Sequence, residues 1–257
     1  MIKLSLIGTL ILIGTFTSIC IGQEKQKKIS LSFSSGPSVP VFSYSKHNGS
    51  NSAIWTGSWI EGFSKAQSGF AKTGFEYHLN ADYKINSFLK LILLCGSYSN
   101  SVATQEMSDY LTLSNSNKEI KAEEGKYKYY YFTTGLGYYY SIKKFEINFN
   151  LFCGFGISQY PYYKFILLYT NLDPPIEFEH VGPKPNLKSF ICGSSLSASY
   201  IISKTINIGI NIQYQMASYP YNVYPQSVPG GSPHQFDFSD KLKVRVINIG
   251  PKIEFCF

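Results

Sequence analysis

The last segment of the chain, from Lys241 to Phe257, alternates in side-chain character almost to its final residue. Residues two positions apart point to the same face of a β-strand, so this pattern predicts a strand with one apolar face and one small or polar face. Counted back from the end, the apolar set is Phe257, Phe255, Ile253, Pro251, Ile249 and Ile247, and the opposite set is Cys256, Glu254, Lys252, Gly250 and Asn248. A two-faced strand ending on an aromatic residue therefore closes the chain.

The first residues have the pattern of an export signal. Lys3 is followed by an apolar run from Leu4 to about Phe16, then by small residues. This order predicts a signal peptide over residues 1–22 with cleavage before Gln23, which leaves one domain over residues 23–257. Two other interpretations remain open: an uncleaved membrane helix, and a lipoprotein signal at Cys20 that the bulky Ile19 disfavours.

Seven further alternating runs precede the terminal strand. They predict eight strands over residues 29–35, 72–85, 88–97, 129–142, 145–157, 187–202, 206–216 and 241–257. Turns of two or three residues (Asn86–Ser87, Lys143–Lys144 and Ser203–Thr205) alternate strictly with long polar loops. We therefore expect an all-β fold, an eight-stranded antiparallel up-and-down transmembrane barrel with both termini at the end that carries the short turns. If Ala53–Ile60 or Lys164–Thr170 add strands, the barrel has ten.

The apolar faces are expected to meet lipid and the polar faces the interior. The polar faces consist mostly of Gly, Ser, Asn and Gln, which make a poor water-exposed surface, whereas the apolar faces carry aromatic residues near their ends, as in membrane barrels. Charged residues are only 15% of the chain, and the 21 tyrosines and 19 phenylalanines make it unlike an ordinary soluble enzyme. The net charge of +7 comes from scattered lysines, so we expect contact with lipid headgroups and lipopolysaccharide phosphates, and no nucleic acid as partner.

The inward faces predict a polar network inside the barrel. An eight-stranded barrel is just wide enough for its side chains to fill it, so opposite charges there should pair and rigidify the wall. The residues expected in this network are Glu76, His78, Asp82, Lys84, Glu146, Lys252 and Glu254, and Lys90 is also expected inside. The alternative is a narrow conducting path through the same lumen.

A catalytic site is not expected. His78 and Asp82 share a face but lie four strand positions apart, about 13 Å and too far for contact. Ser195, Ser197 and Ser199 face the same lumen without a motif around them, and the other histidines lack ligand spacing. We therefore predict no catalytic residues, no metal and no cofactor. The four cysteines after the signal lack CxxC spacing, and a Cys153–Cys192 bridge between neighbouring strands is left open.

The long loops are the expected place of function. They carry exposed aromatic residues among prolines and glycines, which suit partner binding and equally suit folding over the barrel mouth. The candidates for partner contact are Trp55, Trp59, Tyr162, Tyr169, Tyr221 and Tyr224.

The whole predicted domain resembles the small outer-membrane β-barrel domain family, similar to OmpA- and OmpX-type barrels and to PorT-like proteins. The resemblance rests on the Ile29–Ser35 strand followed by Gly36-Pro37-Ser38-Val39-Pro40-Val41, on the Asn86–Ser87 turn and on the terminal Ile253–Phe257. It implies insertion into the outer membrane of a Gram-negative envelope by the barrel assembly machinery. PorT-like members are associated with protein secretion, although nothing in these residues selects that branch. The contrast between a filled lumen and long aromatic loops predicts a non-enzymatic structural or partner-binding role, which includes that of an accessory to a surface or secretion complex. A lipid- or peptide-modifying enzyme and a narrow pore are the alternatives.

Overall fold

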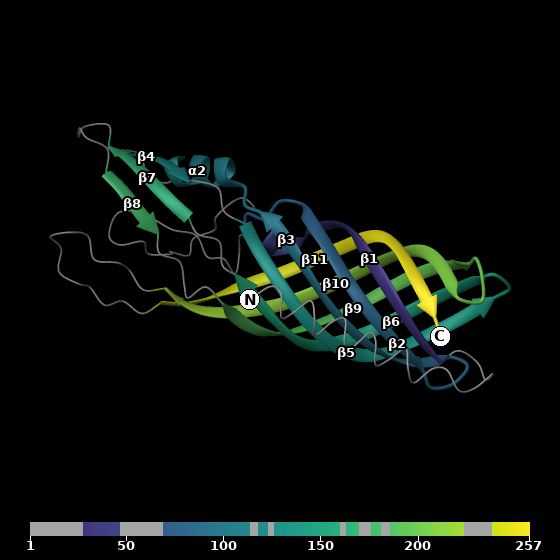
Figure 1. Ribbon diagram of the computed structural model, residues 1–257. Coiled ribbons are helices and arrows are strands. Elements are labelled where there is room, and N and C mark those ends of the chain that lie inside the picture. The colour runs from purple at the N-terminus through teal and green to yellow at the C-terminus, as the bar shows by residue number, and fades with distance from the viewer. Residues whose placement is uncertain are drawn as a thin grey trace, which may run out of the picture.

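Eight strands close into one antiparallel barrel (Figure 1), in a computed structural model that describes residues 28–46, 69–113, 118–122, 126–159, 163–169, 176–180, 186–223 and 238–257. The order around the barrel is β1-β11-β10-β9-β6-β5-β3-β2. The strands are β1 Ile29–Pro40, β2 Gly74–Lys84, β3 Leu89–Ser101, β5 Lys126–Ile142, β6 Phe145–Gln159, β9 Leu187–Ile201, β10 Ile206–Val223 and β11 Phe238–Cys256. Closure joins the first and last strands, with Ser30 opposite Cys256.

The predicted fold class and all eight predicted strands are confirmed, and the ten-stranded alternative is wrong. β1 and β2 pair directly, so no strand from the intervening loop separates them. Ala53–Ile60 itself lies outside the described residues. The Lys164–Thr170 segment does form a strand, β7 (Tyr163–Tyr169), but this strand pairs outside the barrel.

A second sheet is built from two of the long loops. Its order is β4-β7-β8, where β4 (Lys118–Ala122) comes from the loop between β3 and β5, and β7 and β8 (Ile176–His180) come from the loop between β6 and β9. Helix α2 (Thr104–Leu113) contacts β4. Figure 1 shows this sheet and α2 beyond the end of the barrel opposite the C-terminus. We call this the loop end, and the end that carries the short turns and the C-terminus the turn end.

Several barrel strands run further toward the loop end than their alternation predicts. β10 was expected to end near Met216, yet it continues paired with β11 as far as Val223 opposite Phe238. β1 likewise extends past Ser35 to Pro40. Backbone hydrogen bonds between neighbouring strands continue there although the side-chain pattern has faded, and the pairing, not the pattern, sets the strand length.

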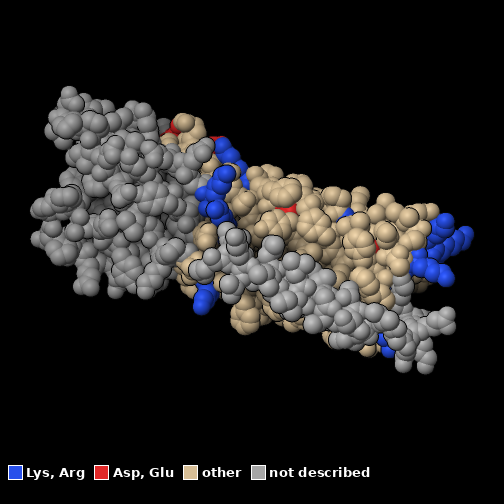
Figure 2. All heavy atoms as spheres, in the orientation of Figure 1, with Lys and Arg blue, Asp and Glu red and all other residues tan. Residues whose placement is uncertain are grey.

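The barrel is apolar outside and polar inside. Leu151 and Phe155 are 57% and 74% exposed on the outer surface, whereas Asn148 and Gln213 are buried inside. Figure 2 shows lysine and arginine gathered toward the two ends of the barrel, with few charges on the surface between them. This distribution is the reverse of that of a water-soluble barrel and matches a surface that faces lipid. Within the described residues, no helix is long and apolar enough to cross a membrane.

Candidate functional site: the polar lumen and its turn-end pocket

Buried ion pairs line the lumen. Lys90 Nζ lies 2.7 Å from Asp82, Lys252 Nζ lies 2.9 Å from Glu254, and Lys84 Nζ lies 3.3 Å from Glu146. The fourth pair joins His78 Nδ1 to Glu76. The structure thus places all seven residues expected in the network inside the barrel and joins each to an oppositely charged or hydrogen-bonding neighbour.

Strand periodicity and cross-strand register position these groups. Glu76, His78, Asp82 and Lys84 are even-numbered residues of β2, and β3 adds Lys90 directly opposite Lys84. Lys90 was expected inside but not as a member of the network, and its ion pair with Asp82 is the most buried of those formed by lysines, with both side chains at most 2% exposed. The alternation of either strand alone does not give the register between β2 and β3. That register brings Lys90 within reach of Asp82.

Neutral donors complete the coordination of the carboxylates. The Asn80 amide donates to Asp82 at 2.7 Å, the Asn148 amide to Glu146 at 3.0 Å, and the Tyr131 hydroxyl to Glu76 at 2.9 Å. These bonds compensate the loss of water around buried charge, which would otherwise be expensive.

A nucleophile and a base do not meet among the described residues. His78 bonds Glu76, while Asp82 is held by Asn80 and Lys90, so His78 and Asp82 do not form a pair. Ser195, Ser197 and Ser199 lie on β9, which is separated from β2 by three strands in either direction around the barrel. In the described part of the chain, no three His, Cys, Asp or Glu residues form a group suited to a metal ion.

The lumen wall also carries neutral polar atoms that lack a protein partner. The buried atoms Ser197 Oγ, Ser199 Oγ, Asn148 Oδ1 and both side-chain polar atoms of Asn248 have no hydrogen-bond partner among the described residues. Buried polar groups in proteins are satisfied by protein or by ordered water. We therefore expect ordered water along this wall.

A cluster of buried tyrosines closes the lumen toward the loop end. Tyr98 stacks on Tyr129 with ring centroids 4.6 Å apart, and Tyr127 stacks on Tyr129 at 6.2 Å. Tyr44 meets Tyr127 edge-on at 5.4 Å, and Tyr219 also contacts Tyr129. We call these five residues, each below 2% exposed, the tyrosine plug. Burial raises the pKa of the Tyr44 phenol well above its usual value, so this group is a neutral hydrogen-bond donor at physiological pH.

Tyr44 enters the plug from outside the strands. It lies in the short helix η1 (Phe42–Tyr44), which follows β1, and its hydroxyl lies 3.0 Å from that of Tyr129. The Gly69 N–H donates a hydrogen bond to the Ser43 carbonyl, and the Ala71 N–H donates one to the Tyr44 carbonyl. These bonds join the segment that follows β1 to the segment that precedes β2. This cluster was not predicted, because the strand was expected to begin at Tyr129. The alternation of Tyr127, Tyr129 and Tyr131 is the sequence signal that would have begun the strand earlier, toward the loop end.

Glycines make room for inward aromatic rings. A Cβ placed on Gly96 would lie 2.6 Å from Tyr131 Cζ, and one on Gly193 would lie 2.6 Å from the Phe152 ring. These two positions need glycine for lack of space.

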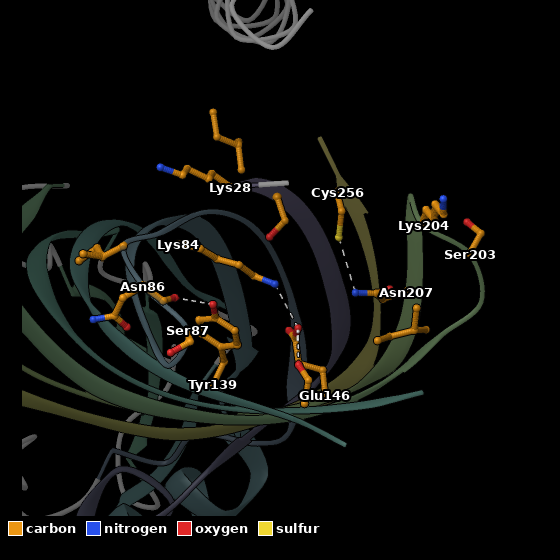
Figure 3. A pocket seen from close by; sticks show the side chains of 15 residues that line it. Lys28, Lys84, Asn86, Ser87, Tyr139, Glu146, Ser203, Lys204, Asn207 and Cys256 are labelled. Atoms are coloured by element: carbon orange, nitrogen blue, oxygen red, sulfur yellow. Dashed lines mark hydrogen bonds and ion pairs between the residues drawn. The ribbon is translucent and has the colours of Figure 1, made fainter. Parts of the chain in front are cut away.

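The turn end of the lumen holds a pocket of about 430 Å³ (Figure 3). Three lysines line it, Lys28, Lys84 and Lys204, with one carboxylate, Glu146. Lys84 points toward Glu146 and lies 4.6 Å from the centre of the Tyr139 ring. We call this the turn-end pocket.

Cys153 and Cys192 lie directly opposite one another on β6 and β9, and both face outward. Neither forms a disulfide within the described residues, and Cys95 does not either. We refer to Cys153 and Cys192 as the cross-strand cysteine pair.

The loop candidates for partner contact have no described side chains. Trp55, Trp59, Tyr162 and Tyr224 lie outside the described residues, as does the expected signal peptide. Tyr169 ends β7 and Tyr221 lies in β10, but only their backbone is described.

Comparison with known proteins finds likeness in structure only. No protein-family model matches the sequence, and no curated protein matches it. Among solved structures, OprG from Pseudomonas aeruginosa is 12% identical with a TM-score of 0.49, covering 89% of this chain and 97% of that one. Neisserial surface protein A is 12% identical with a TM-score of 0.44 over 89% and 97% of the two chains. Ail of Yersinia pestis is 12% identical with a TM-score of 0.38 over 90% and 100%.

These TM-scores lie below 0.5, so the assignment rests on the closed strand order, the apolar exterior and the polar interior. A closed barrel satisfies every backbone group inside lipid, and short turns at one end with long loops at the other are typical of barrels in the bacterial outer membrane. The turn end therefore faces the periplasm and the loop end the outside. The chain has the architecture of a small eight-stranded outer-membrane β-barrel.

Proposed function

We propose that this barrel is a non-conducting, non-enzymatic anchor that holds a folded platform outside the cell for binding a partner macromolecule. One observation carries the proposal: two long loops from separate strand pairs join in the sheet β4-β7-β8, with α2 against β4. Independent flexible loops would not need to pair, whereas a fixed surface presents its contact residues at a lower entropic cost of binding.

The filled lumen supports a role other than transport. The tyrosine plug occupies the loop end, and the ion pairs of Asp82, Glu146 and Glu254 occupy the part nearer the turn end. An ion crossing this path would have to displace stacked rings that have no exposed edge. Water beside the neutral polar atoms of the lumen wall therefore ends at the plug and does not form a continuous path.

The absence of catalysis is part of the same proposal. Among the described residues, His78 is engaged by Glu76 and the serines of β9 lie across the barrel, so hydrolytic chemistry lacks an assembled pair. We expect His78→Ala to leave lipopolysaccharide and surface-peptide profiles unchanged. A changed profile would favour the enzymatic alternative.

Exposed lysines at the loop end can contact the lipopolysaccharide that is expected on the outer side of the membrane. Lys126, Lys128, Lys188 and Lys243 all have exposed side chains near this end of their strands. Ammonium groups at this level can pair with phosphates of lipopolysaccharide. We propose this lipid as a partner of the barrel, in addition to the protein partner of the platform and the assembly machinery that inserts it.

Two measurements test the proposal. In planar bilayers the purified protein should show no unitary conductance, whereas Tyr98→Ala with Tyr129→Ala should conduct because the plug loses its central stack. In intact cells, a membrane-impermeant cross-linker should give a defined protein adduct. This adduct should disappear when the β3–β5 and β6–β9 loops are replaced by short Gly-Ser turns.

The loop-replaced protein must still shift in a gel on heating, which shows that its barrel is folded. A conducting wild-type protein refutes the closed lumen. An adduct that persists without both loops refutes the platform.

A further inference from the structure

The turn end of the lumen is hollow, unlike the plugged loop end. The turn-end pocket, about 430 Å³, lies between the start of β1, the β2–β3 turn and the β9–β10 turn. Cavities of this size accept small molecules or the end of a chain. Its position inside the barrel mouth separates it from the lipid-facing exterior.

Side-chain charge in the pocket is unbalanced. Lys28, Lys84 and Lys204 contribute three positive charges against the single carboxylate of Glu146. Glu146 is already engaged by Lys84 at 3.3 Å, by Ser141 at 3.4 Å and by Asn148 at 3.0 Å. Within the described part of the chain no ion pair is formed by Lys28 or Lys204, so two cationic groups remain without an acceptor.

Neutral donors of the β2–β3 turn line the same pocket. The Asn86 side-chain oxygen accepts the backbone N–H groups of Phe88 and Leu89, at 3.0 and 2.8 Å, which fixes this oxygen in the turn and leaves the amide nitrogen to donate. The Ser87 hydroxyl lines the same pocket. The hollow therefore offers ammonium, amide and hydroxyl donors, and its one strong acceptor is saturated.

We propose that the turn-end pocket binds the anionic group, carboxylate or phosphate, of a small periplasmic molecule or peptide end. Lys28 and Lys204, which are exposed at the rim on opposite sides of the pocket (Figure 3), attract its charge, and Asn86 and Ser87 donate hydrogen bonds to its oxygens. Lys84, held by Glu146 and lying over the Tyr139 ring, forms the floor. Ammonium and N–H donors recognise oxyanions through charge-assisted hydrogen bonds. This site is independent of the external platform proposed above.

The test is calorimetric titration of the full-length refolded protein in an uncharged maltoside detergent. The probes are inorganic phosphate, glycerol 3-phosphate and N-acetyl-glycyl-glycine, with the neutral amide of the last as control. We expect saturable one-to-one binding of at least one anionic probe and none of the amide. Preference for a phosphate or for the carboxylate probe identifies which source the pocket accepts.

The chain supplies a charge-matched control. Lys143 and Lys144 lie in the β5–β6 turn at the same end but do not line the pocket. Lys28→Gln with Lys204→Gln should weaken binding by about tenfold or more, as loss of charge-assisted bonds does. Lys143→Gln with Lys144→Gln should change it by less than about twofold, because these charges do not line the pocket and salt screens them from an anion inside it.

Equal weakening by both double variants would show diffuse attraction to a basic rim and would overturn the site. Absence of saturable binding by all three anions would overturn it as well. Heat-dependent gel mobility of each variant shows that a lost signal does not come from an unfolded barrel.

Discussion

The ion pair between Asp82 and Lys90 offers a direct measure of how the lumen holds the barrel together. The two charged groups lie 2.7 Å apart, and their side chains are 2% and 1% exposed. The perturbations are Asp82→Asn, Lys90→Met and the two combined. Each single change removes one charge and leaves the other buried.

The magnitude follows from distance and burial. At 2.7 Å and an effective dielectric constant of about 20, the attraction is roughly 6 kcal/mol, most of which offsets the desolvation of both ions. Removing one partner leaves an uncompensated charge, so each single variant should lose about 3–5 kcal/mol of unfolding free energy. The double variant leaves no stranded charge, so the coupling between the two sites should reach about 2–3 kcal/mol.

The assay is urea unfolding of the refolded protein in detergent micelles, followed by circular dichroism and by heat-dependent gel mobility. The midpoint should shift while the slope stays constant, which shows that stability and not compactness has changed. A matched control lies at the loop end, where Lys72 and Glu106 are 3.4 Å apart but 47% and 40% exposed. Its cycle, with Lys72→Met and Glu106→Gln, should give a coupling of about 1 kcal/mol or less.

The reasoning is refuted if the Asp82–Lys90 cycle gives a coupling as small as the Lys72–Glu106 cycle. Additive single effects would mean that neighbours such as Asn80 and Lys252 compensate either charge alone, and that the pair does not act as a unit.

Three further outcomes are expected. Unfolded protein without reductant should titrate as four thiols after signal cleavage; a count of two would show that the cross-strand cysteine pair has oxidised. Leu151→Arg, on the exposed outer face midway along β6, should cost about 2–4 kcal/mol in bilayer unfolding, whereas Phe145→Arg at the strand end should cost at most about 1 kcal/mol; equal costs would place the membrane elsewhere. Gly96→Ala should lose about 1–3 kcal/mol in the micelle assay because its Cβ would lie 2.7 Å from the His78 Cβ; an unchanged midpoint would show that the interior rings can move.

Much of the barrel was predictable because the relevant signal is local. A period of two assigns each side chain to one face without knowledge of any partner strand, so the inward positions of Glu76 and Lys252 followed from alternation alone. The strand that carries Lys90 is apolar on both faces, and Lys90 was expected inside because of its charge. The strict succession of short turns and long loops then favoured eight strands over ten and placed the two termini at a common end. Strand ends were less accurate, since β10 continues to Val223 where alternation no longer marks it.

The partners within the lumen were not predictable in the same way. His78 shares a face with both Glu76 and Asp82. The register between β2 and β3 sets Lys90 opposite Lys84 and diagonal to Asp82, and the contact of Asp82 with Lys90 leaves Glu76 as the partner of His78. The tyrosine plug depends on Tyr44, which reaches Tyr129 from a helix outside the strands. In both contacts the two residues come from different elements, and no periodic pattern in the sequence relates their positions.

The sequence by itself determined that this chain forms a membrane barrel, which face meets lipid and which residues lie inside, because these depend on the order of neighbouring residues. The tertiary structure alone decided that two loops pair into one external sheet, that the loop end is plugged, and that the turn end is left open as a lysine-lined pocket. These features depend on closure and register, which bring together segments far apart in the chain and are fixed only when every strand has found its neighbour.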